Sequence, residues 1–229
     1  MRTFILGCGA AALIACGGRT DDKLGLEGPS SGTSAADYPA GDYGYDIGKV
    51  VPNVAFVGWE HTDPATTIDT KADPIGTVRI SDFYDPSGLR GLTYLVVSVH
   101  VVWCAPSNEQ DDFTNGANWT GGNTGGANFA ERYASKGVRF MTLLEQGPTF
   151  GTDATLDDLR GWVTHHVART SQALVSRDEM ALDVVGPAWP YNMIVDLRTM
   201  RVVDTWLGFD VDNVELDAFT GLPNRVALH

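Results

Sequence analysis

The run LTYLVVSVHVVW, at 92–103, constrains the fold of this chain more than any other stretch. Half of its residues are β-branched, and apolar side chains occupy both sets of alternating positions. A strand with two apolar faces needs a covering layer on each side, which is typical of a central strand in a covered sheet. The run is therefore predicted to lie in the middle of such a sheet.

Further strands and helices follow from apolar periodicity and capping residues along the rest of the chain. Strands are predicted at 49–59, 138–146 and, around a turn at Leu197–Thr199, twice within 191–208, and 77–83 is predicted to be a short strand or the turn after one. Helices are predicted from Ala105, over 128–137, over 155–169 with Thr155 and Asp158 as a capping pair, and from Asp212 to Gly221. Strands and helices mixed in this order predict an α/β fold with a mixed β-sheet flanked by helices.

Length and composition limit the class of protein. The 229 residues are 43% hydrophobic and 20% charged, which suits a globular domain with a sizeable core. The formal net charge is −13, and no cluster of basic residues is present. Binding to a phosphate backbone needs Lys and Arg, so the composition argues against nucleic acid as a partner.

The first fifteen residues have the pattern of an export signal. Arg2 is followed by the short apolar run FILGCGAAALIA, which falls short of the roughly 20 residues that span a bilayer. The run ends in Leu-Ile-Ala-Cys at 13–16, which resembles the bacterial lipobox. The resemblance implies cleavage before Cys16, a lipid on its thiol and anchoring to a membrane of the cell envelope. Gly17, in place of the Asp typical of inner-membrane retention, favours the periplasmic face of the outer membrane.

Composition divides the chain into three parts: a signal at 1–15, a flexible tether at 16–46 and one domain at 47–229. The tether is rich in Gly, Ser, Asp and Pro and has no apolar periodicity. Its GPSSG at 28–32 matches a hydrolase pattern, but the strand and helix that this pattern needs are missing.

Within the domain, the Gly/Asn-rich insertion at 114–128 interrupts the helix that starts at Ala105. We expect a tolerated surface loop, with a lid or groove wall as the alternative.

The sequence contains three cysteines, and their positions leave one free thiol. Cys8 leaves with the signal and Cys16 takes the lipid, so Cys104 remains. Cys104 immediately precedes the predicted helix, whose unpaired N–H groups favour the thiolate form. Ser107, three residues later, is placed to donate its hydroxyl to that thiolate. A lone thiol in an exported protein is either reactive or buried and inert.

The residues around Cys104 resemble thioredoxin-like proteins of the TlpA/redoxin type. The resemblance rests on Trp103-Cys104-x-Pro106 after an apolar strand, on Gly48-x-x-x-Pro52 and TVRISDF before it, and on GPAWPYNMIVDLRTMRVV after it. It covers about 47–220.

The resemblance implies thiol-disulfide exchange, with Cys104 as the attacking residue and Pro106 as the motif proline. It implies that Pro190 is the cis-proline facing the sulfur. Trp103 would be the aromatic residue beside the cysteine, and the backbone of Trp189 would pair with substrate.

The chain departs from this family at the resolving position, where Ser107 replaces a second cysteine. No internal disulfide can form, so release of a bound substrate needs an external thiol. Ser98 stands where many thioredoxins carry a buried Asp. Val101 stands where peroxiredoxins carry a Thr, which argues against peroxidase activity.

No metal site and no cofactor are predicted. His100 and Cys104 share strand parity, but four strand residues span roughly 13 Å, too far for one ion. His165 and His166 are adjacent on a helix, about 100° apart, and are predicted to lie on a solvated face. The Asp210-x-Asp212 pattern lacks the Gly of a calcium loop.

These observations leave two main functions open. The first is a membrane-anchored monothiol protein, monomeric, that acts on protein disulfides or low-molecular-weight thiols through Cys104. The alternative is a redox-inactive lipoprotein that binds a protein partner in the groove between Cys104 and Pro190. A third reading, less favoured, is a structural lipoprotein of the envelope.

Overall fold

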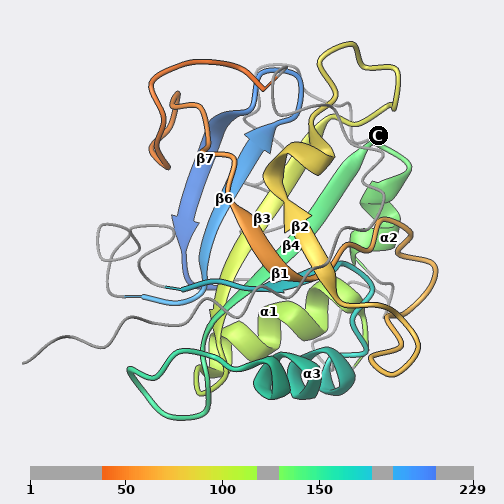
Figure 1. The fold of residues 1–229 in the computed structure, drawn as a ribbon, viewed down its shortest axis with the longest axis vertical. Helices are drawn as coiled ribbons and strands as arrows, with labels where there is room; N and C mark the ends of the chain where they lie inside the picture. The colour runs from red at the N-terminus through yellow and green to blue at the C-terminus, as the bar shows by residue number, and fades with distance from the viewer. Residues whose placement is uncertain (1–37, 118–128, 177–187, 210–229) are drawn as a thin grey trace, which may run out of the picture.

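The computed structural model describes residues 38–117, 129–176 and 188–209, and within them the chain forms one mixed seven-stranded sheet covered by helices (Figure 1). The strands, in chain order, are β1 (Ala55–Trp59), β2 (Gly76–Arg79), β3 (Tyr94–Val101), β4 (Val138–Gln146), β5 (Ser171–Leu174), β6 (Tyr191–Asp196) and β7 (Arg201–Leu207). The helices are α1 (Ala105–Asn115), α2 (Phe129–Ala134) and α3 (Leu156–His165), with a 3-10 helix at Ile80–Phe83. The predicted α/β class with a mixed sheet is confirmed.

Strand β3 is an interior strand, as its sequence predicts. The sheet order is β2-β1-β5-β4-β3-β6-β7, and β3 pairs in parallel with β4 and antiparallel with β6. Every residue of β3 is buried. Leu95, Val97 and Val99 belong to the larger apolar cluster on one face, whereas Tyr94 and Val96 belong to a second cluster on the other face.

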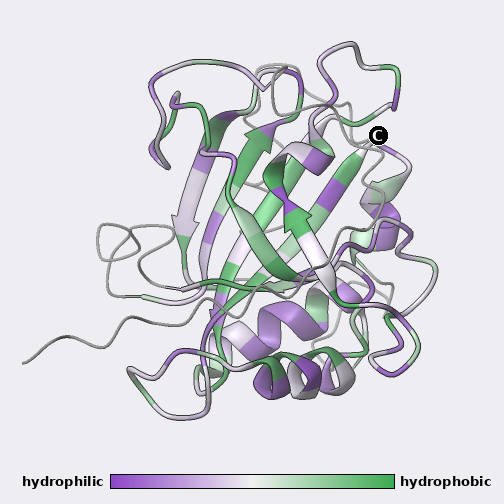
Figure 2. Cartoon of the chain, viewed as in Figure 1, coloured by the Kyte–Doolittle hydropathy of each residue, from purple (hydrophilic) through white to green (hydrophobic). Residues whose placement is uncertain are grey.

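Helices α1 and α3 lie side by side along the sheet (Figure 1). Figure 2 shows hydrophobic residues gathered along the strands, whereas α1 is largely hydrophilic along its length. Its buried residues are correspondingly mostly polar: Ser107, Gln110, Asp111, Phe113, Thr114 and Asn115. Side-chain hydrogen bonds therefore contribute much of the contact between this helix and the sheet.

The start of α3 follows the predicted capping pair. The Thr155 hydroxyl accepts the Asp158 N–H at 3.2 Å, and the Asp158 carboxylate accepts the Thr155 N–H at 2.8 Å. These bonds satisfy N–H groups that the first helical turn leaves unpaired. The helix ends at His165, earlier than the predicted 169, because Val167 adopts a positive φ of 49° and turns the chain.

Strand β5 is absent from the strands predicted above. Its sequence, SQAL, is short and half polar and carries no β-branched residue. It is nevertheless buried, because it lies between β4, to which it is parallel, and β1, to which it is antiparallel. Without β5 the first hairpin would not join the rest of the sheet.

The last part of the predicted tether, 38–46, contacts the domain. The Tyr38 hydroxyl donates to the carbonyl of Val51 at 2.7 Å, and Tyr43 forms a β-bridge with Val50. The signal at 1–15, most of the tether, most of the 114–128 insertion and the helix from Asp212 lie outside the described residues and stay predictions. No helix in the described part of the chain combines the length and apolarity needed to cross a membrane.

Gly137, which links α2 to β4, is expected to tolerate no side chain. Its φ is +81°, and a Cβ there would lie 2.1 Å from the carbonyl oxygen of Gly91. We predict that Gly137→Ala lowers the free energy of unfolding by about 1–2 kcal/mol for the left-handed backbone and a further ~1–3 kcal/mol for the clash. Urea unfolding followed by circular dichroism measures the change.

Gly48→Ala is the matched control, because Gly48 has a φ of +88° and a Cβ at this position would have no neighbouring atom within 4 Å. Its loss of unfolding free energy should therefore reflect only the left-handed backbone. Equal losses in the two variants would contradict the predicted clash at Gly137.

Candidate functional site

Cys104 lies where β3 passes into α1, and its sulfur contacts a segment far away in the sequence. It is the N-cap residue of α1, is partly exposed, and Pro106 follows in the first turn. The Sγ atom lies 3.5 Å from the carbonyl oxygen of Trp189, eighty-five residues later. The Trp189–Pro190 peptide bond is cis.

The pairing of β3 with β6 explains this contact. The two strands are antiparallel, with Val99 opposite Tyr191. The carboxyl end of β3 and the amino end of β6 therefore meet at one end of the sheet, and the residues just beyond them, Cys104 and Pro190, become neighbours. The structure brings together two segments that the family resemblance assigns to one site, while the roles of their residues stay predictions.

Ser107 is buried and faces the strand. Its hydroxyl accepts the Val101 N–H at 3.5 Å, and its carbonyl accepts a hydrogen bond from His100 Nδ1 at 2.9 Å. Between the two described residues Ser107 and Cys104 there is no side-chain hydrogen bond. The hydroxyl contributes here to the junction of β3 with α1, and its expected donation to a thiolate stays a prediction.

Aromatic rings border the thiol. Trp103 is 38% exposed and packs against Trp189, with ring centroids 5.5 Å apart. Trp103 also packs against Phe150, with ring centroids 5.2 Å apart. Phe150 is 70% exposed and comes from the loop after β4, which the sequence analysis does not connect with the site.

The comparisons with known proteins concern the fold. No family model matches the sequence, and no curated protein matches it. A Chlorobium tepidum protein, provisionally described as the thiol:disulfide interchange protein DsbE, has a similar crystal structure with a TM-score of 0.51 at 16% identity, covering 74% of this chain and 91% of that one. The fold is thioredoxin-like. The thioredoxin domain of a Bacteroides vulgatus thiol-disulfide oxidoreductase is also similar, with a TM-score of 0.45 at 17% identity, covering 74% and 96%.

In this thioredoxin-like fold, two buried side chains at the end of β4 accept hydrogen bonds from the indoles of the two tryptophans. Glu145 accepts the Trp189 indole N–H at 2.7 Å, and Gln146 accepts the Trp103 indole N–H at 3.1 Å. From the sequence, both residues are expected only to end a strand. The one available signal is a pair of polar residues closing an otherwise apolar run.

The inner face of α1 binds the sheet through polar side chains. The Gln110 amide donates to Ser98 Oγ at 2.8 Å and to Asn192 Oδ1 at 2.6 Å. Asp111 accepts from the Thr142 hydroxyl at 2.8 Å and from the Trp162 indole at 2.9 Å. Ser98, at the position of the buried Asp of many thioredoxins, is thus part of a neutral hydrogen-bonded group.

The prediction that both histidines at the end of α3 lie on a solvated face is wrong for His166. His165 is exposed, whereas His166 is fully buried and its Nδ1 lies 2.7 Å from the Asp112 carboxylate. The helix ends at His165, and the turn that follows directs the next ring toward α1 rather than toward solvent.

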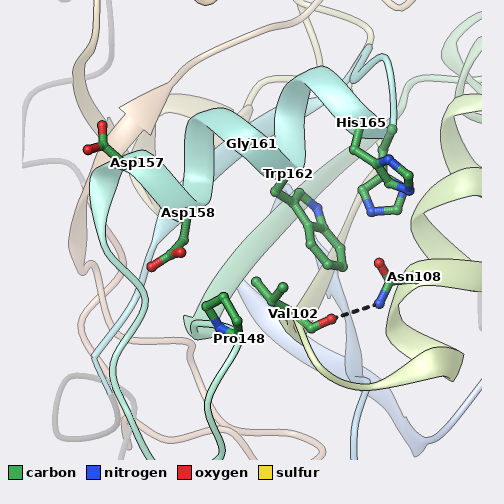
Figure 3. Close-up of a pocket in the computed structure, with 9 residues that line it drawn as sticks. Val102, Asn108, Pro148, Asp157, Asp158, Gly161, Trp162 and His165 are labelled. Carbon is green, nitrogen blue, oxygen red and sulfur yellow. Dashed lines mark hydrogen bonds between the residues drawn. The ribbon is translucent and has the colours of Figure 1, made fainter.

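A pocket of about 280 Å³ lies between α3 and the first turn of α1 (Figure 3). Trp162 and Pro148 line it, and Asn108 and Val102 lie on its α1 side. Asn108 Nδ2 donates to the carbonyls of Val102 at 3.0 Å and Cys104 at 2.8 Å. The pocket therefore adjoins the turn that carries the thiol but does not include the thiol.

His100 provides a test of the buried polar interface. Burial lowers its pKa from 6.5 to about 4, although Asp111 and the Ser107 carbonyl oppose the shift. The His100 imidazole is therefore protonated near pH 6.5 in the unfolded chain, but only near pH 4 in the folded chain. The stability that this neutral histidine contributes is complete above pH 6.5 and is lost as the pH falls through that window.

We predict that lowering the pH from 7 to 5 costs the wild-type protein up to about 2 kcal/mol of unfolding free energy through His100. His100→Gln keeps a side-chain donor and removes the titration, so its pH dependence should be shallower by that amount. Urea unfolding at pH 7, 6 and 5 measures both proteins. Identical pH profiles would show that His100 does not titrate in this way.

Proposed function

We propose that this protein is an exported, membrane-anchored thioredoxin-like protein that carries out thiol-disulfide exchange through Cys104 as a monothiol. The observation that carries the proposal is the placement of the partly exposed residue Cys104 at the start of α1, with its sulfur 3.5 Å from the carbonyl oxygen that precedes Pro190. This placement combines a nucleophile, a helix N-terminus and an adjacent backbone carbonyl.

The first chemical step is attack by the Cys104 thiolate on one sulfur of a substrate disulfide. The substrate S–S bond breaks, a mixed disulfide with Cys104 forms, and the other substrate sulfur leaves as a thiolate. The unpaired N–H groups at the start of α1 favour the attacking anion. Once the thiol proton has left, the Trp189 carbonyl is free to accept an N–H group from the backbone of the substrate.

The second step needs another molecule, because Ser107 cannot resolve the mixed disulfide. A low-molecular-weight thiolate attacks the substrate sulfur, which frees the Cys104 thiolate and leaves the substrate joined to the small thiol. A second small thiol then removes the first as a disulfide. The two electrons that reduce the substrate therefore come from two external thiols, and Cys104 ends the cycle unchanged.

The location of the protein follows from its first residues. Leu-Ile-Ala-Cys at 13–16 supports lipid attachment at Cys16 on the periplasmic face of the cell envelope, with the outer membrane favoured by Gly17. Disulfides form and persist in that compartment, so substrates for exchange are present there. We infer protein disulfides or small-thiol adducts as substrates, and a monomeric protein.

Alkylation of Cys104 tests the proposal. In the full chain carrying Cys8→Ser and Cys16→Ser, Cys104 is the remaining thiol. We predict that iodoacetamide at pH 7 modifies it at least about fivefold faster than free cysteine, because the helix start favours the thiolate. Mass spectrometry of the time course measures the rate.

A rate at or below that of free cysteine would refute the exchange function and favour the redox-inactive, partner-binding alternative. The cellular complement is capture of mixed disulfides, which should be found with the wild-type protein and be missing with Cys104→Ala. Capture of the same partners by the wild-type protein and by Cys104→Ala would contradict covalent exchange through Cys104.

A further inference from the structure

Two consecutive side chains at the carboxyl end of β4 are polar although they are almost completely buried. Glu145 is 1% exposed and Gln146 is 2% exposed. Burying such groups is costly unless they are hydrogen-bonded. The Gln146 amide donates to the Glu145 carboxylate at 3.2 Å, so the pair is also linked internally.

Each side chain of this pair also accepts a hydrogen bond from a tryptophan close to Cys104 in the structure. Glu145 Oε2 accepts the Trp189 indole N–H at 2.7 Å, and Gln146 Oε1 accepts the Trp103 indole N–H at 3.1 Å. The two indoles meet edge to face, with centroids 5.5 Å apart. Glu145, Trp189, Trp103 and Gln146 therefore form a closed ring of contacts, and Cys104 touches this ring through the Trp189 carbonyl.

Gln146 also positions the third aromatic residue. Its Oε1 accepts the backbone N–H of Gly151 at 2.8 Å, in the loop that carries Phe150. Phe150 packs against Trp103, with ring centroids 5.2 Å apart. One amide thus binds both the indole of Trp103 and the loop whose Phe150 packs against that indole.

We propose that Glu145 and Gln146 are positioning residues of the thiol site, which set Trp103 and Trp189 for a peptide substrate whose disulfide Cys104 attacks. The inference rests on the proposed function and names the substrate class as a peptide with an extended backbone. Neither side chain touches the sulfur in the described structure. Their effect passes through the indoles and through the Trp189 carbonyl that faces the substrate.

A role in stability alone would not require this arrangement. A buried polar or ionisable side chain is weak evidence for stability, because an apolar residue of similar volume is often equally good or better. Here each side chain accepts a hydrogen bond from one of the two tryptophans near the thiol, and these tryptophans come from different segments of the chain. Misplacement of a substrate-contacting group by about 1 Å is enough to slow a reaction greatly.

The experiment compares two reactions of Cys104 in the full chain carrying Cys8→Ser and Cys16→Ser. On this proposal, exchange with a disulfide-containing peptide needs Trp103 and Trp189 in place, whereas alkylation by iodoacetamide needs only the thiol. We expect Glu145→Ala and Gln146→Ala to slow peptide exchange about tenfold or more, since the indoles lose their anchors. Alkylation should change less than about twofold, because the helix start is untouched.

Conservative and matched variants separate positioning from folding. Glu145→Gln keeps an oxygen that accepts the Trp189 N–H, so exchange should stay within about threefold of wild type. Gln172→Ala removes another fully buried glutamine, on β5, whose amide bonds Thr170, and both reactions should keep their wild-type rates. If Glu145→Ala does not fold, Glu145→Met and Gln146→Ala carry the test.

Three results would overturn the inference: wild-type exchange in the folded alanine variants, exchange and alkylation falling in parallel, or Glu145→Gln as slow as Glu145→Ala. A wild-type chain without peptide exchange would instead overturn the proposed function, and the inference with it. A wild-type chain that exchanges while its variants are unchanged would overturn only the positioning role.

Discussion

The attachment of α1 to the sheet through buried side-chain hydrogen bonds is the constraint on which the site depends. Gln110 and Asp111 bind polar partners on β3, β4, β6 and α3, and the Ser107 carbonyl binds His100. Such bonds are directional, so they fix the rotation and the height of the helix on the sheet more tightly than apolar contacts would. Cys104 is the N-cap of this helix, so the position of the helix also sets the position of the sulfur.

The rest of the site follows from the neighbours of β3. The antiparallel partner β6 begins where β3 ends and so supplies Trp189 and Pro190. The parallel partner β4 ends at the same edge as β3 and supplies Glu145 and Gln146, which accept hydrogen bonds from the two tryptophans. A single buried strand therefore aligns the thiol, the backbone that faces it and the side chains that support the aromatic rings.

The sequence predicts those parts whose signals are local. The bounds of β4 and the capping pair of α3 are examples, and the apolar pattern of β3 places it inside the sheet. Strand β5 is missed because SQAL has neither length nor β-branched residues, and its burial comes only from β1 and β4. The roles of Glu145 and His166 depend on partners more than forty residues away, Trp189 and Asp112, which no local pattern reveals.

The contact between Cys104 and Trp189 also has a kinetic consequence, because it joins residues eighty-five positions apart. Closing so long a loop costs conformational entropy before the contact can stabilise the fold. Non-local pairings of this kind therefore form slowly. A chain in which β3 and α1 have folded but β6 has not docked would hold the thiol without the Trp189 carbonyl. The Cys104 sulfur thus gains its hydrogen-bond acceptor only when the hairpin of β6 and β7 has joined the sheet.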